Sequence, residues 1–393
     1  MMAGMDRLVG IRDGIVAATV PLGSEEVDLD AAAGRYLAAP AIARLPAPPH
    51  TCSAMDGFAI RAADVTGPCT LRVAFAVYAG DAPPRPLSAG ETARVFTGAT
   101  LPPGADAVVR EEAVRSKDAL ATFGEAARSG DHVRLAGEDV AAGGIALGPG
   151  VRIGARQAAL LAAVGVRRVA VHRRPKVAVL ATGDEVVSGR TPDSNGIAVA
   201  GAARALGAEV ERRDVGDTLD EVAAVLAAAL SSADAVLTIG GVSVGEKDHV
   251  PAALGRLGAD VRVHGVPMKP GKPFLFALAG AKPVFGLPGS PSACLAAFEV
   301  FARPALLALA GAGRRERRTV TVRLAAPSTG RPGRARILWA TIEPGGRARP
   351  LGKDAAQVRG PALADAILVV PSGVGDLSEG AEVTAWLLDD DAA

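Results

Sequence analysis

The sequence has little cysteine, and what it has is poorly placed for cross-linking or zinc binding. Its three cysteines, Cys52, Cys69 and Cys294, are odd in number and widely spaced. Their pattern predicts neither a disulfide framework nor a CxxC zinc site. This pattern suits a reducing compartment, and we expect a cytoplasmic protein. No stretch approaches the roughly 18 uninterrupted apolar residues of a membrane span, so we expect no membrane association.

Aromatic residues and net charge are also scarce. Aromatics make up 3% of the chain, and 43 Lys and Arg stand against 42 Asp and Glu, which leaves a net charge of +1. Few aromatics argue against a surface that stacks bases, and a balanced charge creates no broad field for a polyanion. We therefore expect no nucleic-acid partner. Any anion site must be local.

Two common hydrolase signatures are missing as well. None of the five histidines falls in an HExxH or HxH pattern, and no GxSxG segment occurs. Zinc hydrolysis and serine-hydrolase chemistry therefore lack support.

The length of 393 residues corresponds to two to four domains at about 150 residues each. Proline and charge clusters mark the boundaries of a multidomain α/β protein. Helical spacing near residues 8–16 and 154–164 predicts two helices that pack together in a discontinuous connecting domain, 1–50 with 151–174. Short alternating runs predict a β-rich domain at 51–150 and a small all-β domain at 318–393.

Between these lies a segment, 175–313, in which apolar strands alternate with amphipathic helices. This alternation predicts a doubly wound, mostly parallel sheet with right-handed crossovers. Ligands of such folds bind beyond the carboxyl ends of the strands, so the loops there are the informative ones.

Three of those loops favour anions. The first strand ends in Thr182, Gly183, Asp184 and Glu185, and a later strand ends in the glycine-rich segment 240–245. Glycines let backbone amides approach an oxyanion closely. The third loop, 286–292, carries serines that can cap the next helix and leave its amides facing an anion. We expect all three loops to meet at one sheet edge.

Cations and carboxylates accompany these loops. The segment MKPGKP holds Lys269 and Lys272 on a stiff turn suited to phosphate or another oxyanion. Glu185, Asp217 and Asp248 supply hard oxygen ligands that could hold Mg²⁺ against a phosphate. This combination points to phosphate-ester chemistry.

Each element also has a purely structural explanation. The acids can cap helices, the glycines can simply end strands, and the lysines can be solvated turn residues. The functional interpretation rests on their shared position at consecutive strand ends. In the β-rich domain, the segments that contain Asp56, Thr97 and Asp139 have the composition of ordinary turns. Taken alone, they do not indicate a function.

Eight segments taken together resemble the molybdopterin molybdenumtransferase family, which completes molybdenum cofactor synthesis. They occur in the family's order: SAMDGFA, TGA, PPGADAVV, GED, TGDE, GGVSVG, MKPGKP and GLPGSP. The sheet domain alone is less specific, because molybdopterin adenylyltransferases share its fold. The N-terminal and β-rich portions separate the two.

The resemblance implies a helical connecting region, a β-rich second domain, the doubly wound domain and a C-terminal β barrel in an elongated homodimer. It implies a cleft between the sheet domain of one subunit and the second domain of the other. The substrates would be adenylylated molybdopterin and molybdate, with Mg²⁺ as cofactor and AMP released. It also implies transient contacts with a molybdopterin adenylyltransferase and with molybdoenzyme chaperones.

Motif position assigns residues to that cleft. The catalytic set is Asp56, Asp139, Glu185, Asp217, Asp248, Lys269 and Lys272, with the metal held by Glu185, Asp217 and Asp248. The substrate-binding set is Thr97, Thr182, Gly183, Gly240, Gly241, Ser243, Gly245, Pro270, Gly271, Gly289, Ser290 and Arg336, with Arg334 as a neighbouring option for the arginine.

The sequence departs from the family pattern in places. Ser290 stands where the family commonly has asparagine, and Cys52 and Phe58 replace asparagine and tyrosine near the SAMDG motif. Two alternatives stay open: adenylyl transfer itself, and a non-catalytic molybdopterin-binding scaffold.

Overall fold

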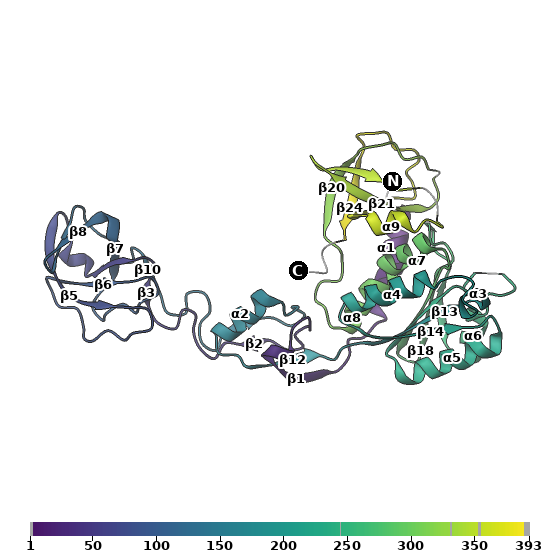
Figure 1. Cartoon of the computed structure of the whole chain (residues 1–393), viewed down its shortest axis with the longest axis horizontal. Helices are drawn as coiled ribbons and strands as arrows, with labels where there is room; N and C mark the ends of the chain where they lie inside the picture. Colours follow the sequence, from purple (N-terminus) through teal and green to yellow (C-terminus); the bar gives the residue numbers. More distant parts are fainter. Residues whose placement is uncertain (1–2, 244, 331, 353–354, 389–393) are drawn as a thin grey trace.

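The computed structural model describes residues 3–243, 245–330, 332–352 and 355–388. The molecule is elongated (Figure 1). A β-rich lobe occupies one end, a slender connecting region follows, and the sheet domain and the C-terminal barrel lie together at the other end (Figure 1). The fold expected from the sequence, a multidomain α/β protein, is confirmed.

The sheet domain holds six strands in the order β14-β13-β15-β19-β18-β16. Three pairings are parallel, but β18 runs antiparallel to both β19 and β16. The mostly parallel sheet expected from the sequence is therefore confirmed, with its antiparallel pairings confined to this edge. Strand β18 passes to β19 through a two-residue turn at Gly280, whose φ of 62° suits a hairpin, and no helix intervenes. The elements are β13 (Lys176–Thr182), α3 (Asp184–Val187), α4 (Ser194–Ala205), β14 (Glu209–Val215), α5 (Leu219–Ser232), β15 (Ala235–Ile239), α6 (Val250–Arg256), β16 (Asp260–His264), β17 (Met268–Lys269), β18 (Leu275–Ala279) and β19 (Lys282–Leu287).

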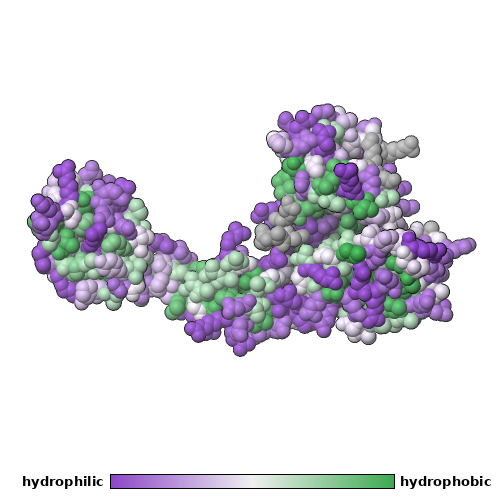
Figure 2. Space-filling view, viewed as in Figure 1, coloured by the Kyte–Doolittle hydropathy of each residue, from purple (hydrophilic) through white to green (hydrophobic). Residues whose placement is uncertain are grey.

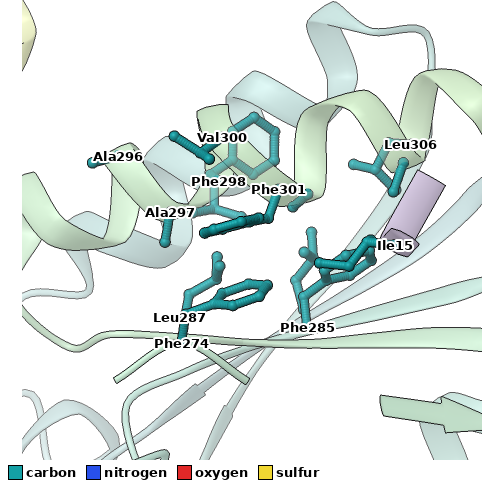
Figure 3. Packing of buried hydrophobic residues seen from close by; sticks show 14 of the residues in the cluster. Ile15, Phe274, Phe285, Leu287, Ala296, Ala297, Phe298, Val300, Phe301 and Leu306 are labelled. Carbon is teal, nitrogen blue, oxygen red and sulfur yellow. The ribbon is translucent and has the colours of Figure 1, made fainter. Parts of the chain in front are cut away.

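The main core lies between this sheet and a continuous helical run. The run comprises α7 (Pro291–Ala297), the π-helical segment η4 (Phe298–Ala302) and α8 (Arg303–Leu309). Phe301 stacks on Phe274 with ring centroids 4.3 Å apart (Figure 3). The run is long and apolar enough to cross a membrane, yet 89% of it is buried inside the protein, as expected of a core helix.

The N-terminal helix α1 (Ala3–Ala17) does not pack on α2 (Ala155–Ala163), so that expectation was wrong. Its buried side chains Leu8 and Ile15 join the core of the sheet domain instead. Figure 3 shows Ile15 in this core. Helical spacing defines an apolar stripe but not the surface that covers it. The apolar stripe of α1 packs against the large apolar face of α8.

The connecting region is therefore built mainly from paired strands. Here β1 (Ser24–Asp28) runs antiparallel to β12 (Arg168–His172), and β2 (Ala41–Ile42) pairs with β11 (Ile145–Leu147). Helix α2 buries Leu161 against these strands. The 3₁₀ turn η1 (Leu29–Ala31) completes the region.

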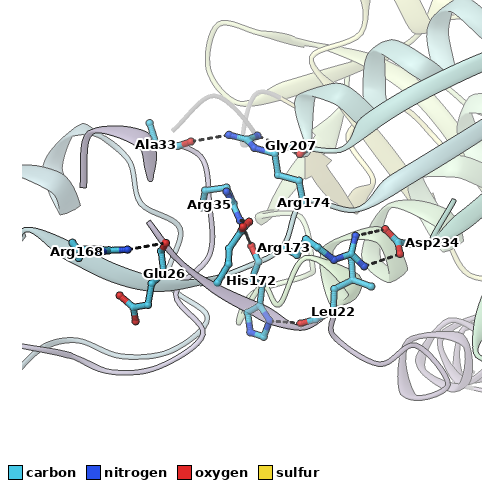
Figure 4. A network of polar contacts seen from close by, with 11 residues as sticks. Leu22, Glu26, Ala33, Arg35, Arg168, His172, Arg173, Arg174, Gly207 and Asp234 are labelled. Atoms are coloured by element: carbon cyan, nitrogen blue, oxygen red, sulfur yellow. Dashed lines mark hydrogen bonds and ion pairs between the residues drawn. The ribbon is translucent and has the colours of Figure 1, made fainter. Parts of the chain in front are cut away.

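Two arginines join the connecting region to the sheet domain (Figure 4). Arg173 forms a bidentate pair with Asp234, at 2.9 and 2.8 Å. Arg174 donates to the carbonyls of Gly207 and Ala33, which belong to the two sides of the junction. Contacts of this kind limit relative rotation of the two parts.

The β-rich lobe is a six-stranded sheet in the order β7-β4-β6-β5-β9-β8, with a small β3–β10 ladder beside it. Its core contains Phe58 edge-on to Phe123. Its elements are β3 (Cys52–Ser53), β4 (Gly57–Ile60), η2 (Ala62–Asp64), β5 (Cys69–Val77), β6 (Glu91–Val95), β7 (Ala107–Arg110), η3 (Glu111–Ala113), β8 (Val114–Lys117), β9 (Leu120–Phe123) and β10 (Val133–Arg134).

The C-terminal strands close into a barrel in the cyclic order β21-β22-β20-β24-β23, because β21 pairs with both β22 and β23. The short β17 of the sheet domain adds to β21 in parallel, with Lys269 opposite Arg336. The barrel is thereby attached to a loop at the edge of the sheet. Its elements are β20 (Thr319–Leu324), β21 (Ala335–Glu343), β22 (Arg347–Pro350), α9 (Arg359–Leu363), β23 (Ala366–Val370) and β24 (Glu382–Leu387).

Candidate active site

The loops after β13, β15 and β19 lie against one another at one edge of the sheet. The Thr182 hydroxyl donates to the carbonyl of Ile239 at 3.1 Å, and the amide of Gly240 donates to that of Leu287 at 3.0 Å. Gly240 has a φ of 83°, and a Cβ there would stand 2.9 Å from Thr182 Oγ1. The close approach of these strand ends therefore requires glycine at 240.

The loop after β19 is fixed from helix α4. The Asn195 side chain donates to the carbonyl of Gly289 at 2.6 Å. Ser290 occupies the N-cap position of α7, but its exposed side chain makes no capping hydrogen bond. The amide of Ser292 donates to the carbonyl of Ala355, so this amide of the first turn does not face an anion.

The two lysines of the MKPGKP segment are exposed beside α7. Between them, Gly271 is buried with a φ of 107°, and a Cβ there would lie 3.5 Å from the carbonyl oxygen of Ala293 in α7. The Lys269–Pro270 peptide is cis. Lys269 and Lys272 thus emerge from a turn that lies along α7, the helix that Ser290 precedes.

An unexpected lysine lies between two of the acids. Lys247 Nζ is 3.4 Å from Asp217 Oδ2 and 3.9 Å from Asp184 Oδ2, and the Asp217 amide donates to Asp184 Oδ1 at 3.0 Å. The only signal for Lys247 in the sequence is its position at the end of the glycine-rich loop. It links the loops that follow β13, β14 and β15.

The remaining expected acids have separate surroundings. Asp248 accepts the amide of Gly245 at 2.7 Å, which shapes the loop, while Ser243 in that loop is exposed. Glu185 is exposed at the start of α3, and its carboxylate lies over Gly183, where a Cβ would be 2.6 Å from Oε1.

Glu185, Asp217 and Asp248 do not form a preassembled metal site. Within the described ranges, no three His, Cys, Asp or Glu side chains come together as ligands of one ion. Asp217 is already paired with Lys247, and Asp248 with its own loop. Mg²⁺ that is held by one or two carboxylates and by substrate phosphates needs no such cage.

Arg336 does not face the sheet edge. Its residue is 5% exposed, and its guanidinium donates to the backbone carbonyls of Ser328 and Gly375 inside the C-terminal domain. Burial lowers the pKa of this guanidinium, and Asp376 opposes that shift. Its backbone pairs with Lys269, so its visible contribution is to attach the barrel.

The second group of expected residues lies on the β-rich lobe. Asp56 Oδ1 accepts the amide and the hydroxyl of Thr97, at 2.7 and 2.8 Å. These hydrogen bonds from Thr97, the amide first, lower the pKa of the exposed Asp56 carboxyl. Asp56 is therefore held ionised and accessible to solvent at neutral pH.

Asp139 has an arginine partner that the sequence did not reveal. Arg134 donates to Asp139 at 2.8 Å and to Glu138 at 3.0 Å. The two hydrogen bonds, the one to Asp139 first, raise the pKa of the Arg134 guanidinium. Arg134 is the last residue of β10 and pairs with Cys52 of β3, so it lies next to the segment that carries Asp56.

Three family models match the chain in order. The MoeA N-terminal region (domain I and II) matches residues 11–165, a probable molybdopterin binding domain matches 178–308, and the MoeA C-terminal region (domain IV) matches 321–388. The chain belongs to the MoeA family. The matches at residues 11–165 and 321–388 lie outside the sheet domain. A protein that consisted of a molybdopterin-binding domain alone would not give them.

Curated MoeA relatives agree with this assignment. The molybdopterin molybdenumtransferase of Nostoc sp. is 38% identical over 304 residues, which cover 73% of this chain and 70% of the relative. That of Haemophilus influenzae is 36% identical over 302 residues and 74% of each chain.

Solved MoeA structures match almost the whole chain. One molybdopterin biosynthesis MoeA protein from Pyrococcus horikoshii has a TM-score of 0.84 at 26% identity, covering 97% of this chain and 99% of its own. Another has a TM-score of 0.75 at 32% identity, covering 97% and 98%.

Mapped on this MoeA chain, the expected residues fall into two distant groups (Figure 1). Asp56, Thr97 and Asp139 belong to the β-rich lobe, whereas the loops with Lys269 and Lys272 belong to the sheet domain. The connecting region separates the two groups within one chain. A single chain therefore does not bring all the expected residues together.

Proposed function

We propose that this protein inserts molybdate into adenylylated molybdopterin and releases AMP. The curated relatives carry the name molybdopterin molybdenumtransferase, and the chain matches them over most of its length. The observation that carries the proposal is the meeting of the TGDE, GGVSVG and GLPGSP loops at one sheet edge. Such an edge, with exposed lysines beside it, suits an anionic substrate.

Each loop has a task in this proposal. Lys269 and Lys272 attract the phosphates or molybdate, and the turn at Pro270 and Gly271 keeps both ammonium groups in place. The backbone of the loop at Gly241 approaches the oxyanion, with Ser243 and Ser290 as hydroxyl donors. The amides of Gly240 and Gly245 hold the loop in shape by donating to Leu287 and Asp248. Thr182, Gly183 and Gly289 shape the floor on which these loops meet.

Magnesium enters the proposal through the substrate. Glu185, Asp217 and Asp248 would supply one or two carboxylates, and the substrate phosphates would supply the other oxygens. The bound ion would neutralise charge on the phosphate ester. Opening the Lys247–Asp217 pair frees the Asp217 carboxylate for that role.

We also propose a homodimer in which two chains share each site. The separation of Asp56 and Asp139 from the sheet-domain lysines supports it, because a second chain can supply the missing lobe. The connecting region offers a surface for contact: the register partners Ile42 and Ile145 are 46% and 63% exposed. A hollow of about 380 Å³ lined by Ile42 lies there, and apolar surface shows on this region in Figure 2. Exposed apolar surface of this kind marks interfaces.

The proposed setting is the cytoplasm, with transient contacts to a molybdopterin adenylyltransferase and to molybdoenzyme chaperones.

An assay of AMP release tests the proposed function. Purified protein is mixed with adenylylated molybdopterin, Mg²⁺ and molybdate, and AMP is measured. Molybdate-dependent AMP release is expected, and its absence with a fully folded protein would contradict the proposal.

A further inference from the structure

The β-rich lobe carries an exposed aromatic stack next to Asp56 and Thr97. Tyr78 and Phe96 lie face to face, with ring centroids 4.7 Å apart and planes 10° from parallel. Arg94 lies over the same Phe96 ring at 5.3 Å from its centroid. Phe96 directly precedes Thr97, whose amide and hydroxyl hold Asp56.

Strand register explains why these rings meet. Strands β5 and β6 are parallel and end with Val77 opposite Val95, so the next residues, Tyr78 and Phe96, leave the sheet side by side. Arg94 precedes Phe96 by two residues and projects from the same face of β6. The stack therefore belongs to a strand end and does not depend on a mobile loop.

The outer ring of the stack is open. Tyr78 is 56% exposed and is the one exposed aromatic residue in the part of the chain that the structure describes. Strand β9, the other neighbour of β5, pairs with it only from Cys69 to Arg72 and leaves the end near Tyr78 uncovered. In a chain with 3% aromatics, an exposed ring in a stack needs an explanation.

We propose that Tyr78 is a stacking platform for a planar nitrogen heterocycle of the substrate, with Phe96 and Arg94 as its support. This rests on the function proposed above, in which the partner's sheet-domain loops hold the phosphates. A heterocycle attached to those phosphates then extends toward the lobe that carries Asp56. Phenol rings stack well on such heterocycles, and the cation on Phe96 stiffens the platform.

The proposed substrate carries two nitrogen heterocycles, a pterin and an adenine, and each contains a flat pyrimidine ring that can stack. The orientation of the substrate decides which one meets Tyr78. The experiment therefore separates the two with AMP and 6-hydroxymethylpterin as competing ligands.

Tyr78→Ala should raise the KM for adenylylated molybdopterin about tenfold or more and leave the KM for molybdate unchanged. Tyr78→Phe keeps the ring and should restore most of the affinity, whereas Tyr78→Leu, which is apolar but not planar, should not. Leu120→Ala is the matched control, because Leu120 is 48% exposed on the same lobe and lies outside the stack. It should behave as wild type.

AMP and 6-hydroxymethylpterin are each tested as inhibitors of wild type and of Tyr78→Ala. The ligand whose inhibition constant rises in Tyr78→Ala contains the ring that stacks on Tyr78. An unchanged KM and unchanged inhibition constants in Tyr78→Ala overturn the proposal. So does a loss of dimer with an unchanged KM, which would make Tyr78 a contact between chains. If wild-type protein releases no AMP, the proposed function fails, and calorimetric binding of AMP and the pterin to wild type and Tyr78→Ala still decides the platform.

Discussion

Trp339, on strand β21 of the barrel, donates its indole N–H to Ser292 Oγ at 2.9 Å. Ser292 lies in the first turn of α7, and both residues are buried. The amide of Ser292 also donates to Ala355. The C-terminal domain thereby holds the start of the helix that follows the Gly289–Ser290 loop.

Loss of this hydrogen bond should destabilise the barrel. Ser292→Ala leaves a buried indole N–H without a partner, so the free energy of unfolding should fall by about 1–3 kcal/mol. Both tryptophans, Trp339 and Trp386, lie in the C-terminal domain, so tryptophan fluorescence in urea follows it. Ser290→Ala, at an exposed position without a capping bond, should change stability by no more than about 0.5 kcal/mol. Equal effects of the two changes would contradict the assignment.

The Arg173–Asp234 pair should make the junction sensitive to acid. Burial raises the pKa of Asp234, but hydrogen bonds from Arg173 and the Lys176 amide outweigh it, so the pKa lies below its usual value. Stability from a lowered carboxyl pKa is present above the unfolded pKa of about 3.9 and is lost as pH falls through the folded pKa.

Asp234→Asn should therefore be less stable than wild type at pH 7, and the difference should shrink below about pH 4. Urea midpoints at a series of pH values measure this. Asp260→Asn removes a surface pair with Arg262 and serves as the control, with little expected change at any pH. If the difference in the free energy of unfolding between Asp234→Asn and wild type does not change with pH, the charge of Asp234 is not the cause of that difference.

Lys272→Ala should weaken the binding of the anionic substrate. A charge-assisted hydrogen bond is worth about 1.5–3 kcal/mol, so the KM for adenylylated molybdopterin or for molybdate should rise about tenfold or more. Lys117→Ala, an exposed lysine on β8, controls for the loss of a positive charge in general. Wild-type affinity for both substrates in Lys272→Ala would show that this lysine is only a solvated turn residue.

Asp248→Asn should slow AMP release about tenfold or more at saturating Mg²⁺. The asparagine oxygen can still accept the Gly245 amide, so the loop keeps its shape while a charge is lost. Asp220→Asn, at a side chain that is 90% exposed and paired with Arg256, is the matched control. If both variants release AMP at the wild-type rate, Asp248 does not assist through its charge.

Mixed dimers test the shared site. Asp56→Asn and Lys269→Ala chains, each inactive alone, should regain activity after subunit exchange. One cleft then carries both changes and the other carries neither, so activity should reach at most about half of wild type. No recovery after verified exchange, or an active monomer in sedimentation, would place the whole site within one chain.

The sequence by itself determined the local elements of the sheet domain and the place of its loops. Strand Ala235–Ile239 and its neighbours follow from apolar runs between helical stretches, and parallel β/α alternation puts Thr182 and Gly240 at the same edge. These features depend on nearest neighbours in the chain and on a single rule of handedness. Local pattern is enough to predict them.

Only the tertiary structure decided which surfaces meet. The apolar stripe of Leu8 and Ile15 fits several partners, and packing on α8 rather than α2 depends on the area that each partner buries. Arg336 was expected at the site, and its guanidinium is held by the carbonyls of Ser328 and Gly375, which lie in two loops that meet only once the barrel strands have paired. The pairing of Lys247 with Asp217 and the alignment of Tyr78 with Phe96 join segments far apart in sequence, and such contacts exist only once the strands are in register.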